Sequence, residues 1–157
     1  MEEALPNSGP IQAAVYPAIS YEEFGRLLRK YGFPAEPLTK NGRFGYRTLT
    51  EPCFTAWMQS PFKGRPDEYA SVFLGGFVDL PPAVARASMH ALNWKLMVAH
   101  VTTSRPGRLA VAHTLIVHGG ITEYYLRDQL WHWSQDLHRI RDEVRKQARR
   151  AAGATLH

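Results

Sequence analysis

The chain contains a single cysteine, Cys53, among its 157 residues. One thiol cannot form an intramolecular disulfide, so a disulfide-stabilised secreted fold is excluded and a reducing cytoplasm is the expected location. Long apolar runs are also missing, because the longest, residues 109–117, includes His113 and Thr114 and falls far short of the roughly 20 residues of a membrane helix. Residues 1–20 hold no lysine or arginine, which an export signal would carry. We therefore expect a soluble protein with no membrane partner.

Acidic residues are outnumbered, with 14 against 19 basic ones, which gives a net charge of +5 at pH 7. Residues 139–150 alone hold six basic and two acidic side chains, so +4 of the +5 belongs to this short segment. Four of its side chains are candidate contacts for an anionic partner such as a nucleic acid: Arg145, Lys146, Arg149 and Arg150. A solvated helix end is the alternative interpretation, and binding there would be non-specific and salt-dependent.

Sequence motifs of catalysis are lacking. There is no phosphate-binding loop, no dinucleotide-binding glycine fingerprint, no H-E-x-x-H and no C-x-x-C. Cys53 precedes a hydrophobic run predicted to be a strand, where a buried structural thiol is more typical than a reactive thiolate. We therefore expect a protein that is not an enzyme, with no catalytic residue, no cofactor and no metal.

The seven histidines offer the remaining case for chemistry. His113 and His118 lie five residues apart on one predicted strand, so their side chains point to opposite faces and form no site by themselves. His132 and Asp136 lie four residues apart on a predicted helix and could share a metal, although a solvated helix pair is the more ordinary interpretation. His113 is more typical of a hydrogen-bonded core histidine. A metal-dependent enzyme using His113, His118 or His132 stays open as a third alternative.

The composition, with 45% hydrophobic residues, suits one compact domain. We expect an extended, poorly ordered lead over residues 1–18, a single domain over residues 19–150 and a frayed tail over residues 151–157. Ser20 can accept a hydrogen bond from the Glu23 amide and so begin a helix. Gly32 can end that helix in a left-handed cap.

Strands and a second helix are predicted after this first helix. Residues 34–42 are rich in turn formers and are expected to form a loop. Three short runs then predict an antiparallel meander of three strands: residues 43–49, 53–59 and 68–78. A second helix begins at Pro81-Pro82, with an inner face made of Val84, Ala87, Ala91 and Trp94. A hairpin follows, formed by residues 97–103 and 108–117, and its second strand is expected in the middle of the sheet.

The last predicted element is a long amphipathic helix that Thr122 can cap. Its apolar residues recur at intervals of four, three, four, three and four: Leu126, Leu130, Trp133, Leu137, Ile140 and Val144. The predicted fold class is therefore α+β, with helices packed on a single antiparallel sheet and the element order α-β-β-β-α-β-β-α.

A second stripe lies on the far side of this last helix. Tyr124, Trp131 and His138 are spaced seven residues apart and project at about 160°, 140° and 120° from the apolar seam. A tryptophan opposite the buried seam either covers a second layer of the same domain or contacts a partner. Tryptophan and tyrosine are enriched at interfaces, so these three residues are candidate contacts with a partner or a second copy.

One part of the chain resembles a known family. The matching segments are Asn93-Trp94-Lys95-Leu96-Met97, the strand of residues 109–117 after Gly107-Arg108, and Gly119-Gly120-Ile121-Thr122 at the start of the long helix. Over residues 91–140 this pattern resembles the YbjN family, regarded as bacterial sensory transduction regulators that share their fold with type III secretion chaperones. The resemblance implies a chaperone-like fold and no catalytic residue.

These observations together favour a non-enzymatic protein-binding or chaperone-like regulator of a bacterial cytoplasm, active in signalling or stress response. We expect a homodimer that captures a partner segment in a hydrophobic groove or along a strand edge. Binding of an anionic partner through the basic helix end is the alternative.

Overall fold

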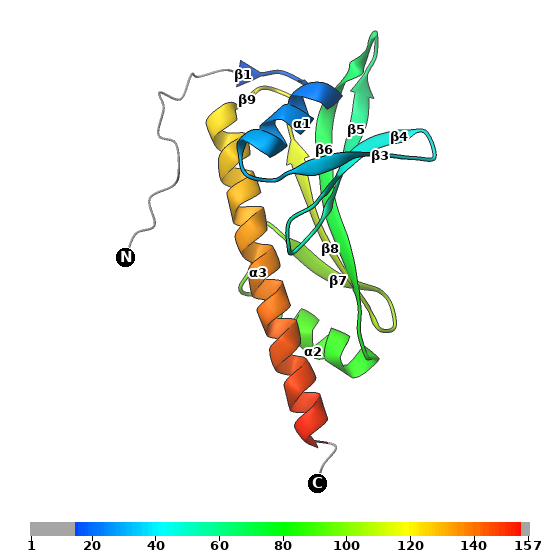
Figure 1. The fold of residues 1–157 in the computed structure, drawn as a ribbon, viewed down its shortest axis with the longest axis vertical. Helices are drawn as coiled ribbons and strands as arrows, with labels where there is room; N and C mark the ends of the chain where they lie inside the picture. The colour runs from blue at the N-terminus through cyan, green and yellow to red at the C-terminus, as the bar shows by residue number, and fades with distance from the viewer. Residues whose placement is uncertain (1–14, 155–157) are drawn as a thin grey trace.

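The computed structural model describes residues 15–154, in which the helices lie against one face of a long, twisted sheet (Figure 1). The elements, in chain order, are β1 (Val15–Tyr16), β2 (Ile19–Ser20), α1 (Tyr21–Lys30), β3 (Ala35–Lys40), β4 (Arg43–Thr48), β5 (Thr55–Phe62), β6 (Arg65–Asp79), α2 (Pro82–Leu92), β7 (His100–Arg105), β8 (Arg108–Ile116), β9 (Ile121–Thr122) and α3 (Glu123–Ala154). The α+β class predicted from the sequence is confirmed. Of the expected lead over residues 1–18, only residues 15–18 are described, and residues 155–157 lie outside the described part too.

The prediction of a single sheet is wrong. Within residues 15–154 the strands form two antiparallel sheets, a main sheet in the order β3-β4-β5-β6-β8-β7, to which β2 adds by pairing with β6, and a small second sheet of β1 and β9. The small sheet joins the chain just before α1 to the turn just before α3. Its strands are two residues long, too short for a periodic pattern to reveal them. Strand β8 lies between β6 and β7, inside the sheet as expected.

Residues 34–42 correct a second prediction, because most of this expected loop is strand β3. It pairs with β4 through the two-residue turn Asn41-Gly42, whose φ angles are 52° and 73°. A turn with two positive φ angles is the tight connection that fits twisted antiparallel strands, and Asn-Gly is its usual sequence. Asn41-Gly42 therefore indicates a hairpin. Strand β3, which precedes this turn, contains Pro37, a residue that is unusual inside a strand.

Helix α2 begins at Pro82 as predicted, but of the four residues predicted for its inner face only Val84 is buried and Ala91 is half-buried. The buried residues are Val84, Ala85, Ser88 and Leu92. Ala87 is exposed, and Trp94 lies beyond the end of the helix with 93% of its surface exposed. The chain leaves the helix at Asn93, so the helical period no longer governs where the Trp94 side chain points.

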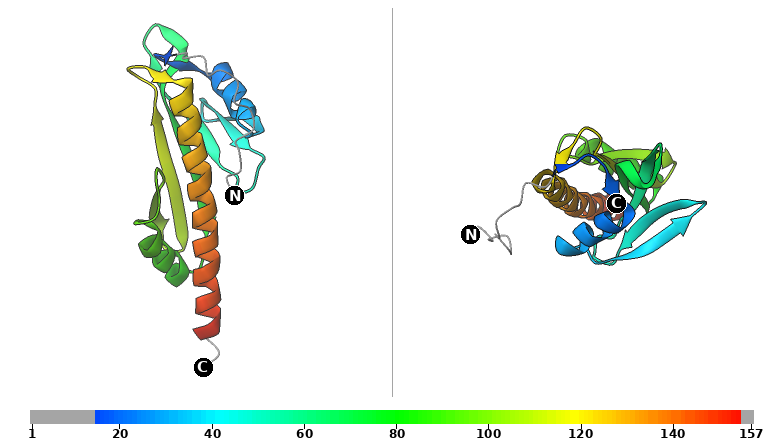
Figure 2. Two further views of the ribbon diagram at one scale, coloured as in Figure 1. Left: turned by 90° about the vertical axis from the view of Figure 1, so that its left-hand side faces the viewer. Right: turned by 90° about the horizontal axis from the view of Figure 1, so that it is seen from above.

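The two other helices begin where the sequence predicts. The Ser20 hydroxyl accepts a hydrogen bond from the Glu23 amide at 3.1 Å, and Gly32 follows α1 with a φ of 84°. The Thr122 hydroxyl accepts one from the Tyr125 amide at 3.1 Å at the start of α3. Helix α3 then runs to Ala154 along the length of the sheet and beyond it (Figures 1 and 2).

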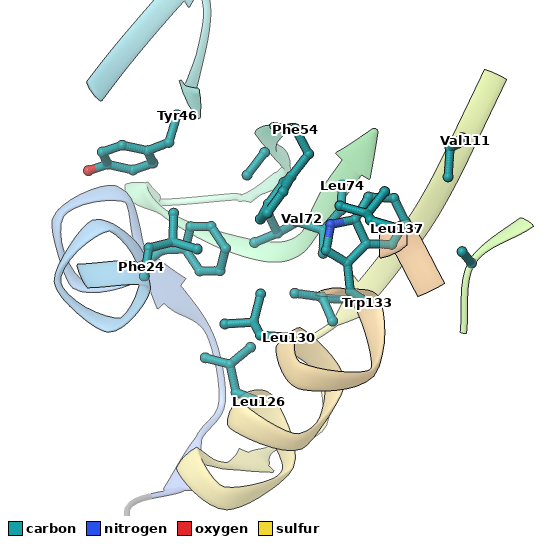
Figure 3. Close-up of a cluster of buried hydrophobic side chains, with 14 of the residues drawn as sticks. Phe24, Tyr46, Phe54, Val72, Leu74, Val111, Leu126, Leu130, Trp133 and Leu137 are labelled. Carbon is teal, nitrogen blue, oxygen red and sulfur yellow. The ribbon is translucent and has the colours of Figure 1, made fainter. Parts of the chain in front are cut away.

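The apolar seam of α3 supplies the centre of the core (Figure 3). The sixth predicted seam residue, Val144, is only partly buried and packs at the margin of the core. The other five are buried: Leu126, Leu130, Trp133, Leu137 and Ile140. Trp133 is fully buried, with its ring edge-on to Phe54 at 5.7 Å between centroids and stacked on His113 at 6.2 Å. This helix therefore holds both the strands and α1 through one continuous apolar surface.

A buried carboxylate fixes α3 to the segment between α2 and β7. Asp136 is fully buried, and its Oδ2 accepts hydrogen bonds from the amides of Met97, Val98 and Ala99 at 2.9, 2.8 and 2.9 Å. Its Oδ1 accepts one from the Arg139 guanidinium at 2.9 Å. Buried amides without acceptors destabilise a fold, so the carboxylate sets where this segment must lie.

Replacing Asp136 by alanine should lower the free energy of unfolding by about 3 kcal/mol, because three amides would lose their acceptor at once. Urea denaturation followed by circular dichroism measures the change. The matched control is Asp142→Ala, which removes an exposed carboxylate of the same helix and should change stability by at most about 0.5 kcal/mol. Equal denaturation midpoints for the two variants would contradict this role of Asp136.

Candidate binding surfaces

The predicted stripe on α3 lies on the outward side of the helix. Tyr124 is 51% exposed and Trp131 46% exposed, while His138 is half-buried. The Arg127 guanidinium lies over the Tyr124 ring at 5.0 Å from its centroid, and the Trp131 ring meets the His132 ring edge-on at 4.8 Å. Within residues 15–154 no second layer covers Trp131, so its indole is available at the surface of the single chain.

A second aromatic surface, which we name the Trp94 loop, comprises residues 93–99. Trp94 is almost entirely exposed and Met97 is 62% exposed. The loop backbone is nevertheless held firmly, by Asp136 at three amides and by Lys95, whose ammonium group lies 3.2 Å from the buried Glu143 carboxylate. Hydrogen bonds from Gln147 and Lys95 outweigh burial and lower the pKa of Glu143, which keeps the charge that Lys95 pairs with. The exposure of Trp94 contradicts its predicted place on the inner face of α2.

The histidines occupy separate places. His113 is half-buried, stacks on Trp133 and shares a hydrogen bond of 3.1 Å with Gln129, which confirms the prediction of a hydrogen-bonded core histidine. Burial lowers its pKa although the Gln129 contact opposes the shift, so the ring is neutral near pH 7. His118 is exposed beyond the end of β8, where its ring lies 5.6 Å from that of Phe62.

The predicted solvated pair of His132 and Asp136 is wrong. Asp136 is buried and accepts amide hydrogen bonds. The Nε2 atom of His132 lies 3.6 Å from Oδ1 of Asp128, one turn earlier in the helix. The description of residues 15–154 contains no group of three or more histidine, cysteine, aspartate or glutamate side chains placed to hold a metal ion. The three histidines of the metal-enzyme alternative are therefore not brought together.

Cys53 is exposed, which corrects the prediction of a buried thiol. Strand β5 begins only at Thr55, so Cys53 belongs to the connection that precedes it. Phe54, the next residue, fills the core position, and its amide and carbonyl both bond to the Thr48 hydroxyl. The connection thus turns Phe54 inward and leaves Cys53 at the surface.

A group of titratable side chains surrounds Glu123, the first residue of α3. The Glu123 carboxylate accepts hydrogen bonds from Lys30, from the Tyr31 hydroxyl and, at 3.3 Å, from the Tyr16 hydroxyl. Burial alone would raise the pKa of Glu123, but these donors outweigh it and lower the pKa. Burial, followed by the hydrogen bond to Glu23, raises the pKa of Tyr16 to about 12. Every group here is engaged, so the cluster joins β1, α1 and α3.

The four basic candidates lie together near the end of α3. Arg145, Lys146, Arg149 and Arg150 are exposed and line, with Asp142, an open hollow of about 430 Å³. None of the four forms an ion pair with another residue of the described range. At this end α3 continues past α2, so the last turns of the helix extend beyond the rest of the domain (Figure 1).

No known protein family and no curated protein matches this chain. None of the helices described in residues 15–154 is both long enough and apolar enough to cross a membrane.

The Glu123 cluster predicts a pH-dependent loss of stability in the variant Glu123→Gln. The pKa of Glu123 is lower in the folded protein than its ordinary value of 4.5. The carboxylate therefore stabilises the fold at any pH above 4.5, and this contribution is lost as the pH falls through the lower pKa of the folded state. At pH 7 the variant should unfold about 2 kcal/mol more easily than the native protein, and the difference should shrink below pH 4.5.

Urea denaturation between pH 3 and pH 7 makes this measurement, with the exposed Glu51→Gln as control. A stability difference that stays constant over this range would show that the charge of Glu123 contributes nothing.

Proposed function

We propose that the protein is a non-enzymatic protein-binding module, a chaperone-like regulator that associates with a second copy of itself through the outward side of α3. The observation that carries this proposal is the exposure of Trp131 on a helix whose opposite side is buried from Leu126 to Ile140. Clustered aromatic exposure of this kind is uncommon on monomeric proteins and typical of contact surfaces. Tyr124, Trp131 and His138 are the proposed contacts.

The geometry of the stripe supports self-association in particular. A helix that presents large side chains every seven positions on one side can pack antiparallel against its own copy. Each Trp131 would then contact the partner's helix near a two-fold axis. The Trp131 side chain lies near the middle of the stripe, where interface tryptophans contribute most. Arg127, above the Tyr124 ring, would lie at the rim of such a contact.

The Trp94 loop supports capture of a further protein segment. Its backbone is fixed by Asp136 before any partner arrives, so little conformational entropy is lost when Trp94 and Met97 become covered. A large exposed indole on a rigid loop suits the recognition of an apolar segment. The resemblance of residues 91–140 to the YbjN family agrees with a chaperone-like regulatory role in a bacterial cytoplasm, in signalling or stress response.

Self-association should weaken at least tenfold in Trp131→Ala while the fold stays intact, because truncation of an interface tryptophan removes about 2 kcal/mol or more. Sedimentation velocity over a range of protein concentrations measures the dissociation constant. Phe77→Ala is the matched control, since Phe77 is 67% exposed on the face of the sheet away from α3 and should leave association unchanged.

Two results would overturn this proposal. One is a native protein that stays monomeric at every concentration tested. The other is a Trp131→Ala protein that loses its folded circular dichroism spectrum, because Trp131 would then be part of the core.

The second candidate function is contact with an anionic partner through the basic helix end. The observation that favours it is that four exposed cations gather there and that none of them is ion-paired with a residue of the described range 15–154. We expect weak nucleic-acid binding with a salt slope of about −3 on a single strand if all four take part. The double variant Arg149→Ala/Arg150→Ala should halve this slope, whereas Arg29→Ala/Arg86→Ala, at exposed positions elsewhere, should not. No binding at low salt removes this candidate.

A further inference from the structure

The face of the main sheet that the helices leave uncovered carries its own aromatic residues. Trp57 of β5 and Phe73 of β6 are directly paired across the strands, and their neighbours Ala56, Met58, Val72 and Leu74 point into the core on the other face. Because successive side chains alternate between faces, Trp57 and Phe73 must lie on the helix-free face. Both are half-buried even without a covering helix.

Two glycines explain how these rings come to lie along the sheet. A Cβ atom at Gly45, paired with Trp57 on the next strand, would lie 2.9 Å from the Trp57 ring, and one at Gly75 would lie 2.6 Å from the Phe73 ring. At Gly45 the added Cβ atom would also clash with the Ala56 carbonyl oxygen, so neither position leaves room for a side chain beside the ring. The glycines therefore allow two aromatic rings to lie over the backbone and keep one broad side of each available above the sheet.

Cations border this aromatic surface. Trp57 and Phe73 line an open hollow of about 580 Å³ together with Gln59 and three residues of the β3–β4 hairpin: Lys40, Asn41 and Arg43. None of the lining residues in the described chain is acidic, and neither Lys40 nor Arg43 forms an ion pair with any residue of the described range. We name this hollow, defined by these six residues, the hairpin hollow.

We propose that the hairpin hollow binds a heteroaromatic base that carries a phosphate, as a free nucleotide or within a single-stranded nucleic acid. A base would stack on Trp57 and Phe73, an interaction that contributes about 1–3 kcal/mol per base. Lys40 and Arg43 would hold the phosphate, Arg43 through paired N–H donors. The amides of Asn41 and Gln59 supply both donors and acceptors for the polar edge of the base.

The charge pattern favours this ligand over an apolar protein segment. An apolar segment would cover Lys40 and Arg43 and remove them from water without supplying a negative charge, which is unfavourable. A nucleotide supplies that negative charge through its phosphate. The hollow is also of a size that suits a small ligand, within the range of roughly 300–1,000 Å³. The proposal goes beyond the protein-binding function, because it uses the opposite side of the sheet from α3.

Fluorescence anisotropy of a labelled ten-nucleotide oligothymidylate tests the site on the full chain at low salt. The native protein should bind, Trp57→Leu should weaken binding about tenfold, and Trp57→Phe should retain most of it because the ring remains. Lys40→Ala/Arg43→Ala should weaken binding and make the salt slope shallower by about 1.4, the share of two cations on a single strand. Circular dichroism confirms that each variant is folded.

Competition with thymidine monophosphate separates the two sources of the ligand. Displacement by the mononucleotide identifies a nucleotide site, and displacement only by unlabelled oligothymidylate identifies a single-strand site. The matched control is Arg149→Ala/Arg150→Ala, which should leave the effect of Trp57→Leu unchanged.

Three results would overturn the proposal. The first is that neither probe binds at low salt. The second is that Trp57→Leu binds as tightly as the native protein. The third is that binding depends on Arg149 and Arg150 alone, which would assign it to the helix end.

Discussion

The hydrogen bonds from three consecutive amides to the Asp136 carboxylate are the constraint on which this architecture depends. They connect the middle of α3 to the segment that leads from α2 into β7, so one buried charge positions both a helix and an edge of the sheet. With α3 fixed in this way, its apolar seam covers one face of the sheet and the other face stays open. The surfaces proposed for binding, on α3, on the Trp94 loop and in the hairpin hollow, all follow from that arrangement.

Much of the fold could be predicted from local patterns. The seam from Leu126 to Val144 has the period of a helix, and Ser20 marks a helix start whose chemistry is entirely local. Strand β3 was missed because Pro37 and the turn formers around it concealed a strand that only pairing with β4 reveals. The small β1–β9 sheet joins segments more than 100 residues apart, and two residues per strand carry no periodic signal.

The candidate site was predictable only in part. Helix geometry predicts the position of Trp131 opposite the seam, but it leaves open whether a second layer of the same domain covers the indole, and the structure shows it exposed. Trp94 does not follow the predicted pattern, because α2 ends at Leu92 and the helical period stops there. The role of Asp136 could not be predicted, because its amide partners lie 37 to 39 residues away in the sequence. The hairpin hollow could not be predicted either. Alternation along a strand shows which side chains share a face, but the tertiary fold decides which face the helices cover.

The four tryptophans have four different environments. One measurement can therefore test the central claim, that the contact surface is formed by exposed aromatic residues and not by the core. In fluorine NMR of 5-fluorotryptophan-labelled protein, raising the protein concentration should shift or broaden the Trp131 resonance and leave the buried Trp133 resonance unchanged. A Trp131 resonance that is insensitive to concentration, or a Trp133 resonance that moves with it, would contradict the account.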